Sequence, residues 1–549
     1  MERILFIVPP YVSHESFVNP AFNDGTIEKK SGKYRSIATD MPIGLISMSA
    51  YLKKNTRVEI RLIDCNVVLN KLERFDYRSF TEMFRDLLSQ QQWLEYAPTI
   101  VGVSSLFTPA YYNTIDVGRV AREIFPAALL LAGGGVPTNI YRDIFRDSDC
   151  FDALCYGEGE KPLLSLVDAP DKRELLATHP AWITRAKADA RQTFHHDFVE
   201  SLDEIPFYDY DILNVDDYSL NPTIGTFATF DTRQHIFHIA SSRGCTHHCS
   251  FCASHTVHGR KMRYHSLERI REDFQRLKER FGAKTVVFQD DHFMADKKRA
   301  LEIIAIVREN GMTAFFQSGL ALYALDRNVL AALKSIGLSQ IVLSVESGSN
   351  RVLKEIMHKP LNLNIVRRVI EDCHELGIAT DVTILIGLPG ETKQDIEDAR
   401  AFLKTLDATW FRFNVATPLV GSEMLDVSIK GNYLKGNYID CDFKRAVIET
   451  PDFTPEFIQE KAYALNLELN FVGNSDVRRG NYARALQGFE NTLHKKSDHA
   501  FAFYFAAQCY RKLGQDVKYQ EYKRQYEEIV RESAFWRGYV RQFDLAPLA

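Results

Sequence analysis

The stretch SSRGCTHHCSFCASHTVHGRKMR, residues 241–263, determines how the rest of the chain is interpreted. It carries Cys245, Cys249 and Cys252 in the spacing C-x3-C-x2-C. This spacing lets one short loop direct three thiolates to a common point, and soft thiolates select iron–sulfur clusters, Zn²⁺ or Cu(I). Because a [4Fe–4S] cube has four irons, three cysteines would leave one iron free to bind a small chelating molecule.

An aromatic residue, Phe251, stands directly before the last of these cysteines. With it, the motif resembles the signature of the radical S-adenosylmethionine (SAM) family. The resemblance implies that the amino and carboxylate groups of SAM chelate the open iron. It also implies that an electron from the reduced cluster, supplied by a donor such as flavodoxin or ferredoxin, cleaves SAM to methionine and a 5′-deoxyadenosyl radical. Phe251 is then expected beside the adenine.

A structural zinc site is the alternative for the same loop. It would use the three cysteines with His255 or His258 as the fourth ligand. His247 and His248 fall between the cysteines and are expected to be ordinary loop side chains. The remaining cysteines of the nine in the chain are dispersed, so the 245–252 group stands out.

Length and composition indicate an ordinary globular protein of about three domains. The chain has 549 residues, 45% of them hydrophobic and 25% charged, and a formal net charge of −5. That charge gives no support to a nucleic-acid partner. The amino terminus lacks the pattern of a signal peptide, and no apolar stretch reaches the roughly 20 residues that span a bilayer. The odd number of cysteines favours a reducing compartment, so we expect a cytoplasmic protein with no membrane partner.

Residues 1–190 are predicted to form an α/β domain. β-rich apolar runs at 4–8, 58–64, 100–105, 127–131 and 154–156 alternate with helical segments such as 45–53, and a long polar loop follows the first run. This alternation predicts a doubly wound, Rossmann-like parallel sheet, on which ligands bind at the carboxyl ends of the strands. Those ends carry Ser104-Ser105, the glycines Gly133-Gly134-Gly135, and a Gly-Glu-Gly-Glu turn at 157–160.

Several features together resemble the cobalamin-binding domain that precedes many radical SAM enzymes: Pro9-Pro10, Pro42-x-Gly44, a strand ending in Asp64, the two serines, the glycines followed by Pro137-Thr138, and the GEGE turn. The resemblance implies cobalamin contacts at Ser104, Ser105, Gly133, Gly134 and Gly135. Tight packing alone could also require these glycines. Only His14 precedes the GEGE turn, and the cobalt-ligating motif D-x-H-x-x-G is missing, so we predict that no histidine ligates the lower face of cobalamin.

Residues 191–430 are predicted to form a second α/β unit. Its strands are expected at 235–241, 285–288, 314–318, 341–346, 381–387 and 411–415, with a helix at 267–281 capped by Ser266. Six strands with intervening helices resemble the partial, TIM-like (β/α)6 barrel of radical SAM enzymes, with chemistry at the carboxyl ends of the strands.

Polar residues and glycines gather at those strand ends. The family resemblance implies SAM contacts at Asp290, Glu346, Ser347, Gly387 and Gly390. For Asp290 a helix cap or a loop contact is an equal alternative, and the two glycines could simply form a turn. Arg263 and Ser266 also fit the family pattern. An arginine expected shortly after Gln317 is replaced by Ser318-Gly319-Leu320.

The remaining residues are predicted to be helical. Residues 431–450 and 455–471 are interpreted as a helical linker, spanning 431–475, that packs on the barrel. In the tail, 476–549, Gly514 follows Gly480 by 34 positions (514 − 480), which is the tetratricopeptide period. One full repeat is too short for a free-standing array, so we expect this TPR-like tail to pack against the rest of the chain, with docking of a protein partner as a further possibility.

The leading hypothesis is a cobalamin-dependent radical SAM enzyme, with a [4Fe–4S] cluster, SAM and cobalamin as cofactors, that methylates an unactivated carbon of a small-molecule substrate. A cyclase or rearrangement enzyme with the same cofactors and a cobalamin-binding sensor or scaffold are the alternatives. No catalytic side chain can be named from the sequence, and neither can the substrate.

Overall fold

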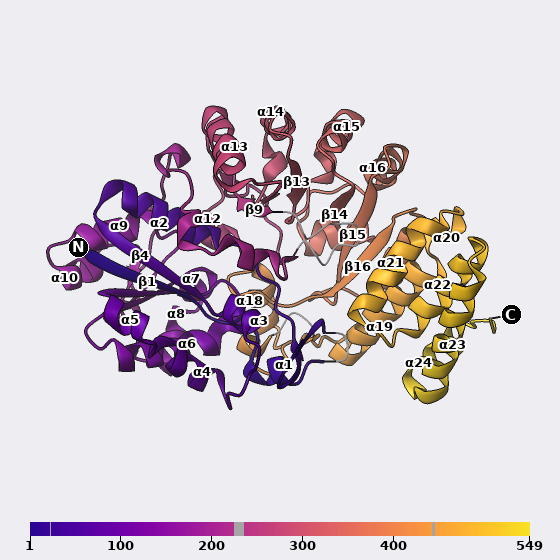
Figure 1. Cartoon of the computed structure of the whole chain (residues 1–549), viewed down its shortest axis with the longest axis horizontal. Coiled ribbons are helices and arrows are strands. Elements are labelled where there is room, and N and C mark those ends of the chain that lie inside the picture. Colours follow the sequence, from indigo (N-terminus) through magenta and orange to yellow (C-terminus); the bar gives the residue numbers. More distant parts are fainter. Residues whose placement is uncertain (22–23, 224–234, 442–444, 549) are drawn as a thin grey trace.

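A six-stranded sheet forms the amino-terminal part of the protein (Figure 1). The structure is a computed structural model that describes residues 1–21, 24–223, 235–441 and 445–548. The sheet has the order β4-β1-β5-β6-β7-β8, in which only β8 runs antiparallel. The strands are β1 (Glu2–Val8), β4 (Val58–Asp64), β5 (Ile100–Ser104), β6 (Leu129–Gly133), β7 (Ala153–Cys155) and β8 (Trp182–Ile183).

Both faces of this sheet are covered, as the apolar runs predict. In β1, Leu5 and Ile7 face a core shared with α4 (Phe80–Leu88) and α6 (Tyr111–Ile124). Ile4 and Phe6 face the opposite core, with α2 (Ile43–Asn55) and α9 (Glu160–Asp168). The predicted doubly wound sheet is therefore confirmed. The chain reverses its direction of winding between β1 and β5, the place where such sheets bind ligands.

The segment after β1 differs from the long polar loop predicted for it. It contains α1 (His14–Val18) and a hairpin of β2 (Thr26–Lys29) and β3 (Gly32–Arg35). The hairpin is anchored by Tyr34, which stacks on Phe17 with 5.2 Å between ring centroids. Aromatic residues spaced along a polar segment give no periodic signal, which is why the sequence did not reveal this hairpin.

The second α/β unit contains the six predicted parallel strands. They are β9 (Ile236–Ile239), β12 (Thr285–Phe288), β13 (Thr313–Phe316), β14 (Gln340–Glu346), β15 (Ala379–Ile386) and β16 (Trp410–Val415). They form two sheets of three, β9-β12-β13 and β14-β15-β16, joined by a parallel bridge between Leu320 and Leu343. Its helices are α13 (Leu267–Phe281), α14 (Lys297–Glu309), α15 (Arg327–Ser335), α16 (Asn364–Glu375), α17 (Lys393–Leu403) and α18 (Glu423–Lys430).

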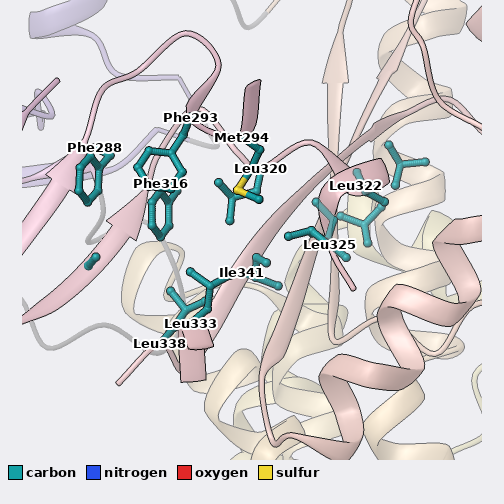
Figure 2. Packing of buried hydrophobic residues seen from close by; sticks show 14 of the residues in the cluster. Phe288, Phe293, Met294, Phe316, Leu320, Leu322, Leu325, Leu333, Leu338 and Ile341 are labelled. Carbon is teal, nitrogen blue, oxygen red and sulfur yellow. The ribbon is translucent and has the colours of Figure 1, made fainter. Parts of the chain in front are cut away.

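Figure 1 shows α13 to α16 in a row outside these strands. Ser266 caps α13 as predicted, because its side chain accepts a hydrogen bond from the Arg269 N–H. The core between strands and helices is apolar, and Figure 2 shows Phe288, Phe293 and Phe316 packed together in it. The strand order and fold confirm the partial (β/α)6 barrel.

The carboxyl-terminal part is helical from Pro455 onward. Its helices are α19 (Pro455–Leu467), the π-helix η10 (Glu468–Val472), α20 (Ser475–Arg478), α21 (Tyr482–Lys495), α22 (Ala500–Lys512), α23 (Asp516–Glu532) and α24 (Ala534–Gln542). They share an aromatic core at the carboxyl-terminal end of the molecule (Figure 1), and α19 and η10 contact β16. The prediction that this tail packs against the rest of the chain is confirmed, whereas its TPR-like character stays a prediction.

The prediction of helix across 431–450 is wrong for the residues described there. Residues 431–441 and 445–450 contain turns, the short 3₁₀ helix η9 (Tyr438–Asp440) and an antiparallel bridge between Leu434 and Ile448. Glycines and asparagines at 431, 432, 436 and 437 favour such turns over a helix. No helix in the described ranges is long and apolar enough to cross a bilayer.

The remaining α-helices are short connectors. They are α3 (Cys65–Lys71), α5 (Gln91–Tyr96), α7 (Gly135–Asn139), α8 (Tyr141–Asp147), α10 (Lys172–Thr178), α11 (Arg185–Asp189) and α12 (His255–His258).

Candidate functional site

The cysteine loop is closed at its base by a two-stranded ladder. Ser242–Arg243 (β10) pairs antiparallel with Arg263–Tyr264 (β11), so residues 244–262 project as a loop beyond β9. Gly244 follows β10 with φ +93°, and a Cβ there would lie 2.4 Å from the Lys261 carbonyl oxygen. Only glycine fits at this position. The sequence did not predict this ladder, because two-residue strands leave no periodic pattern.

The three cysteines of the loop are free thiols and partly exposed. Burial raises the pKa of Cys249 to about 11 and also raises the pKa of Cys245. A bound metal would reverse this, because a coordinating thiol is deprotonated. Within the described ranges, no group of three or more His, Cys, Asp and Glu side chains is arranged to hold a metal ion. The donor set itself, three soft sulfurs on one loop, fits an iron–sulfur cluster.

The two aspartates after β12 hold the first part of the loop. Asp290 is buried, and its carboxylate accepts hydrogen bonds from the Ser241 N–H at 3.0 Å and from the hydroxyls of Ser241 and Ser242 at 2.6 Å each. Asp291 accepts the Gly244 N–H at 2.9 Å and lies 2.8 Å from the Nδ1 of His258. His258, a ligand in the zinc alternative, thus has one ring nitrogen engaged by a carboxylate. Asp290 contacts the residues directly before the loop, Ser241 and Ser242.

The middle of the loop is fixed by two later parts of the chain. The Ser250 N–H donates to the Met357 carbonyl at 2.9 Å, and its hydroxyl donates to the Ile356 carbonyl at 2.7 Å. Both acceptors belong to the end of the π-helix η8 (Val352–Ile356) and the residue after it. The Ser250 carbonyl in turn accepts the Met424 N–H of α18 at 2.8 Å. π-Helices are uncommon and often mark functional sites.

Glu346 ends β14 in a strained conformation. Its φ is +67°, and the register of β14 against β15 shifts beside it. A non-glycine residue in this region is uncommon, and such strain gathers at functional sites. Burial raises the pKa of Glu346, whereas the nearby Lys359 ammonium lowers it, and the Thr383 hydroxyl donates to its carboxylate at 3.2 Å. The next residue, Ser347, is buried and its hydroxyl accepts the Ser349 N–H.

The turn Gly387-Leu388-Pro389-Gly390-Glu391 follows β15. Gly387 and Gly390 have φ of +89° and +87°, and a Cβ on Gly387 would lie 2.8 Å from the Ile458 side chain of α19. The buried Glu391 carboxylate accepts the N–H groups of Gly387 and Leu388. Burial raises the pKa of Glu391 to about 7. These glycines are therefore required by the turn itself.

A cavity of about 620 Å³ lies between the sheet and the cysteine loop. From the sheet it is lined by Ser104, Gly133 and Gly134, and from the loop side by Arg243 and His258. It also reaches Ile100 at the start of β5, so it extends along the α2/α9 face of the sheet as well as across its carboxyl edge. Most of its surface is apolar.

Two of the residues predicted at this cavity lie behind its wall. Ser105 is fully buried and accepts a hydrogen bond from the Thr114 hydroxyl, and a Cβ on Gly135 would lie 2.7 Å from the Leu106 carbonyl oxygen. Gly44, from the Pro42-x-Gly44 pattern, also lines the cavity. Sequence reasoning missed other lining residues, among them Tyr11, Gly102, Leu106 and Phe107. Leu106 and Phe107 directly follow the two serines at the end of a strand. That position could have identified them as cavity residues.

The barrel side of the cavity is polar. The Asp40 carboxylate accepts the Gln317 amide at 2.8 Å and lies 3.2 Å from the buried His238 Nε2, while the Gln289 amide donates to Gln317 at 3.2 Å. Although burial opposes ionisation, His238 and Gln317 hold the pKa of Asp40 at about 2. Asp40, Gln289 and Gln317 line the cavity. The sequence gave no signal for this group, because its members lie on four separated segments.

The family model for the Radical SAM superfamily matches residues 239–403. The chain contains a radical SAM domain. The match runs from the last residue of β9 to the last residue of α17, so it includes the cysteine loop, Asp290, Glu346 and the Gly387–Glu391 turn. In this radical SAM domain the loop, the strained glutamate and the glycine turn all lie at the carboxyl ends of barrel strands.

Known relatives extend over most of the chain. An uncharacterized methyltransferase of Pyrococcus horikoshii is 27% identical over 432 residues, covering 79% of this chain and 84% of its own length. Cytidylyl-2-hydroxyethylphosphonate methyltransferase of Streptomyces wedmorensis is 27% identical over 407 residues, covering 68% and 76%. The solved structure of OxsB, a cobalamin-dependent S-adenosylmethionine radical enzyme with aqua-cobalamin and SAM bound, has a TM-score of 0.63 at 13% identity and covers 100% of this chain and 82% of its own. The fold around the radical SAM domain is thus shared.

Proposed function

We propose that this protein is a cobalamin-dependent radical SAM methyltransferase that acts on an unactivated carbon of a small-molecule substrate. When bound, the cluster and SAM would supply hydrogen abstraction and cobalamin would supply the methyl group. Two relatives with methyltransferase names and the fold shared with a cobalamin-dependent enzyme support this assignment.

One observation carries the proposal. A single cavity touches both the edge of the sheet at Gly133 and the cysteine loop at Arg243 and His258. Cofactors held by these two parts of the chain would therefore meet the substrate in one cavity, as methyl transfer between them requires. The polar group around Asp40 lies on the barrel side of the same space and would contact the substrate or the cofactor amides.

The residues of the cavity fit cobalamin. Its wall is mainly apolar, and a Cβ on Gly44 would meet no atom within 4 Å, so backbone approaches the space closely. We propose that Ser104, Gly133 and Gly134 contact the cofactor and that Ser105 and Gly135 hold their loops. His258 is the one histidine among the described residues that line the cavity, and it comes from the cysteine loop rather than from the sheet. We therefore keep the prediction that no protein histidine ligates the lower face of cobalamin.

For the radical SAM domain we propose that Cys245, Cys249 and Cys252 hold the cluster. Phe251, Glu346, Ser347, Gly387 and Gly390 are proposed to line the SAM pocket, and Asp290 is proposed to act by holding the loop. The division into domains at 190, 430 and 475, a flavodoxin- or ferredoxin-like electron donor, a partner for the tail, and a cytoplasmic location remain parts of this proposal. The free thiols of the nine described cysteines are in keeping with a reducing compartment.

Anaerobic purification with quantified iron, sulfide and cobalamin, followed by incubation with SAM and a strong reductant, tests the proposal. We expect a [4Fe–4S] cluster, bound cobalamin and release of 5′-deoxyadenosine. Cys249→Ala should lower deoxyadenosine release to background. Zinc in place of iron, or unchanged release by the Cys249→Ala variant, would refute it. SAM labelled in its methyl group separates the alternatives. The label appears in the product of methyl transfer and stays out of the product of cyclisation or rearrangement.

A further inference from the structure

Four buried charged side chains join the sheet to the cysteine loop. Glu158 and Glu160 belong to the GEGE turn after β7, and Arg243 and Arg263 form the paired positions of β10 and β11. Each of the four is at most 7% exposed. The two arginines therefore flank the cysteine loop at its base, and both carboxylates come from the other α/β unit.

The contacts among these four residues are charge-assisted hydrogen bonds. Arg263 binds Glu158 through two nitrogens, with Nη1–Oε2 at 2.9 Å and Nη2–Oε1 at 2.5 Å. Arg243 places Nη1 at 3.1 Å from Glu158 Oε2 and donates Nη2 to Glu160 Oε1 at 2.7 Å. Such bidentate pairs fix direction as well as distance.

Further contacts hold the group in one geometry. The Ser47 hydroxyl of α2 donates to Glu160 at 2.6 Å and accepts from Arg243 at 2.8 Å. Arg263 also donates to the carbonyl oxygens of Val199 and His258, and its guanidinium lies 4.1 Å from the centre of the Phe198 ring. Each arginine and each glutamate thus has a partner of opposite charge, as buried charged side chains require.

The barrel holds a different part of the loop. Asp290 and Asp291 bind residues 241, 242 and 244 and His258, whereas the two arginines face the sheet. Arg243 is two residues from Cys245, so a displacement of its guanidinium would be transmitted to the first cysteine. Glu158, Glu160 and Arg243 also line the cavity, so the same side chains contact the space between the two units.

We propose that the GEGE turn is a positioning latch for the cysteine loop. Glu158 and Glu160 hold the two arginines, and through them the sheet sets the position of the three cysteines relative to the cavity. Glu158 and Glu160 are positioning residues in this arrangement, because they act on the cluster site through Arg243 and Arg263. This inference rests on the proposed function of the three cysteines as cluster ligands.

The test uses the full-length protein, reconstituted anaerobically with iron and sulfide and without cobalamin. Glu158→Gln keeps the shape of the side chain and removes its charge, leaving Arg263 without its carboxylate. In the wild type, adding SAM should change the electron paramagnetic resonance spectrum of the reduced cluster. We expect the fraction of chains that respond in this way to fall about tenfold in the variant, as is found for residues that orient metal ligands through hydrogen bonds. The midpoint potential of the cluster should shift as well, and Glu158→Asp should restore part of both.

Glu468→Gln is the matched control. Glu468 also binds an arginine through two nitrogens, Arg400 at 2.5 and 2.6 Å, but it lies in the π-helix η10, before the tail, and has no part in the cysteine loop. This pair is more exposed than the Glu158–Arg263 pair, so its variant should lose less stability, and it should keep the SAM response. If Glu158→Gln proves insoluble, Arg263→Lys, which keeps the charge and loses the bidentate contact, serves in its place.

The outcomes separate this inference from the proposed function. A wild-type protein that takes up no [4Fe–4S] cluster refutes the proposed function. A wild-type protein with a SAM-responsive cluster, together with a Glu158→Gln variant of the same spectrum and potential, overturns the latch alone. Equal losses in the Glu158→Gln and Glu468→Gln variants also overturn it, because they would indicate general destabilisation.

Discussion

At the scale of single residues, Gly44 offers a direct test of the cavity. It lies in the first turn of α2 and lines the cavity, with open space where a Cβ would project. We expect Gly44→Leu to reduce the cobalamin retained per chain by about tenfold, because its side chain would occupy the space intended for the ligand. Absorbance of the protein-bound cofactor after desalting measures this.

Gly44→Ala is the control for that variant. Alanine adds one methyl group and favours the helix by roughly 1 kcal/mol over glycine, so it should raise the thermal midpoint slightly and keep most of the cobalamin. Retention of cobalamin by the leucine variant at the level of wild type would show that the ligand lies elsewhere.

Glu391 predicts a pH dependence of stability. Burial raises the pKa of its carboxyl from the ordinary 4.5 to about 7, so the folded chain holds this proton more tightly than the unfolded chain does. The stability that this proton contributes is complete below about pH 4.5 and is lost as the pH rises through about 7. The loss is on the order of 3 kcal/mol.

The variant Glu391→Gln should remove this dependence. The amide oxygen can still accept the N–H groups of Gly387 and Leu388, and no charge forms at high pH. We expect the difference in free energy of unfolding, variant minus wild type, to increase in favour of the variant between pH 5 and pH 8, as measured by urea denaturation. A difference that stays constant over this range would contradict the assignment.

At the scale of elements, the outer edge of β16 is covered at Phe411 by the side chain of Asn470, from the π-helix η10. Asn470 accepts the Phe411 N–H at 2.7 Å and donates to the Phe411 carbonyl at 2.7 Å. Asn470 thus pairs with the N–H and the carbonyl of Phe411, which a neighbouring strand would otherwise bind. Unpaired strand edges are prone to aggregation.

Asn470→Ala should destabilise the protein by about 2 kcal/mol, since two backbone groups lose their buried partner. Asn470→Asp keeps the acceptor for the Phe411 N–H, but its ionised form has no donor for the Phe411 carbonyl. Its effect should therefore be intermediate only at a pH where the aspartate is protonated and its O–H can donate. Thermal unfolding measures both, and an alanine variant as stable as wild type would show that water replaces the side chain.

The parallel strands of the two α/β units could be predicted from the sequence, because each is a short apolar run ended by polar or glycine residues. β12 and α13 agree with the prediction residue for residue, at Thr285–Phe288 and Leu267–Phe281. The cysteine motif likewise located a loop that the radical SAM family model includes. The β10–β11 ladder and the hairpin of β2 and β3 could not be predicted, because their pairing depends on tertiary contacts and leaves no local period.

The contacts of the site were predictable only in part. Gly133 and Gly134 were found because a glycine at a strand end is a local signal. The pairing of Glu158 with Arg243 and Arg263 was not, because these residues are separated by 85 positions or more along the chain (243 − 158). The same holds for Asp290: the sequence predicted that it lies at the site, but its hydrogen-bond partners could not be predicted.

At the scale of the whole molecule, the tail is part of the barrel's packing. Phe471 is 1% exposed and stacks on Phe489 of α21 with 5.5 Å between centroids, and Trp410 of β16 lies edge-on to Phe471. We expect deletion of residues 476–549 to lower the soluble yield severalfold and the thermal midpoint by several degrees, because these rings become exposed.

A substitution on the surface of the tail is the control for this deletion. Val517 is 85% exposed, so Val517→Ser should change neither yield nor thermal midpoint. Soluble expression and thermal unfolding of both proteins provide the comparison. A deletion variant as soluble and stable as wild type would instead favour a tail that serves only to bind a partner.

The hydrogen bonds of Ser250 bear on how the protein is made. This residue lies between Cys249 and Cys252 and is hydrogen-bonded to Met357 and Met424, which are translated more than a hundred residues later (357 − 250). A nascent chain on the ribosome therefore carries all three thiols long before their loop can adopt its final shape. We expect iron and sulfide to be inserted after synthesis is nearly finished, and the unprotected thiols to be exposed to oxidation during that interval.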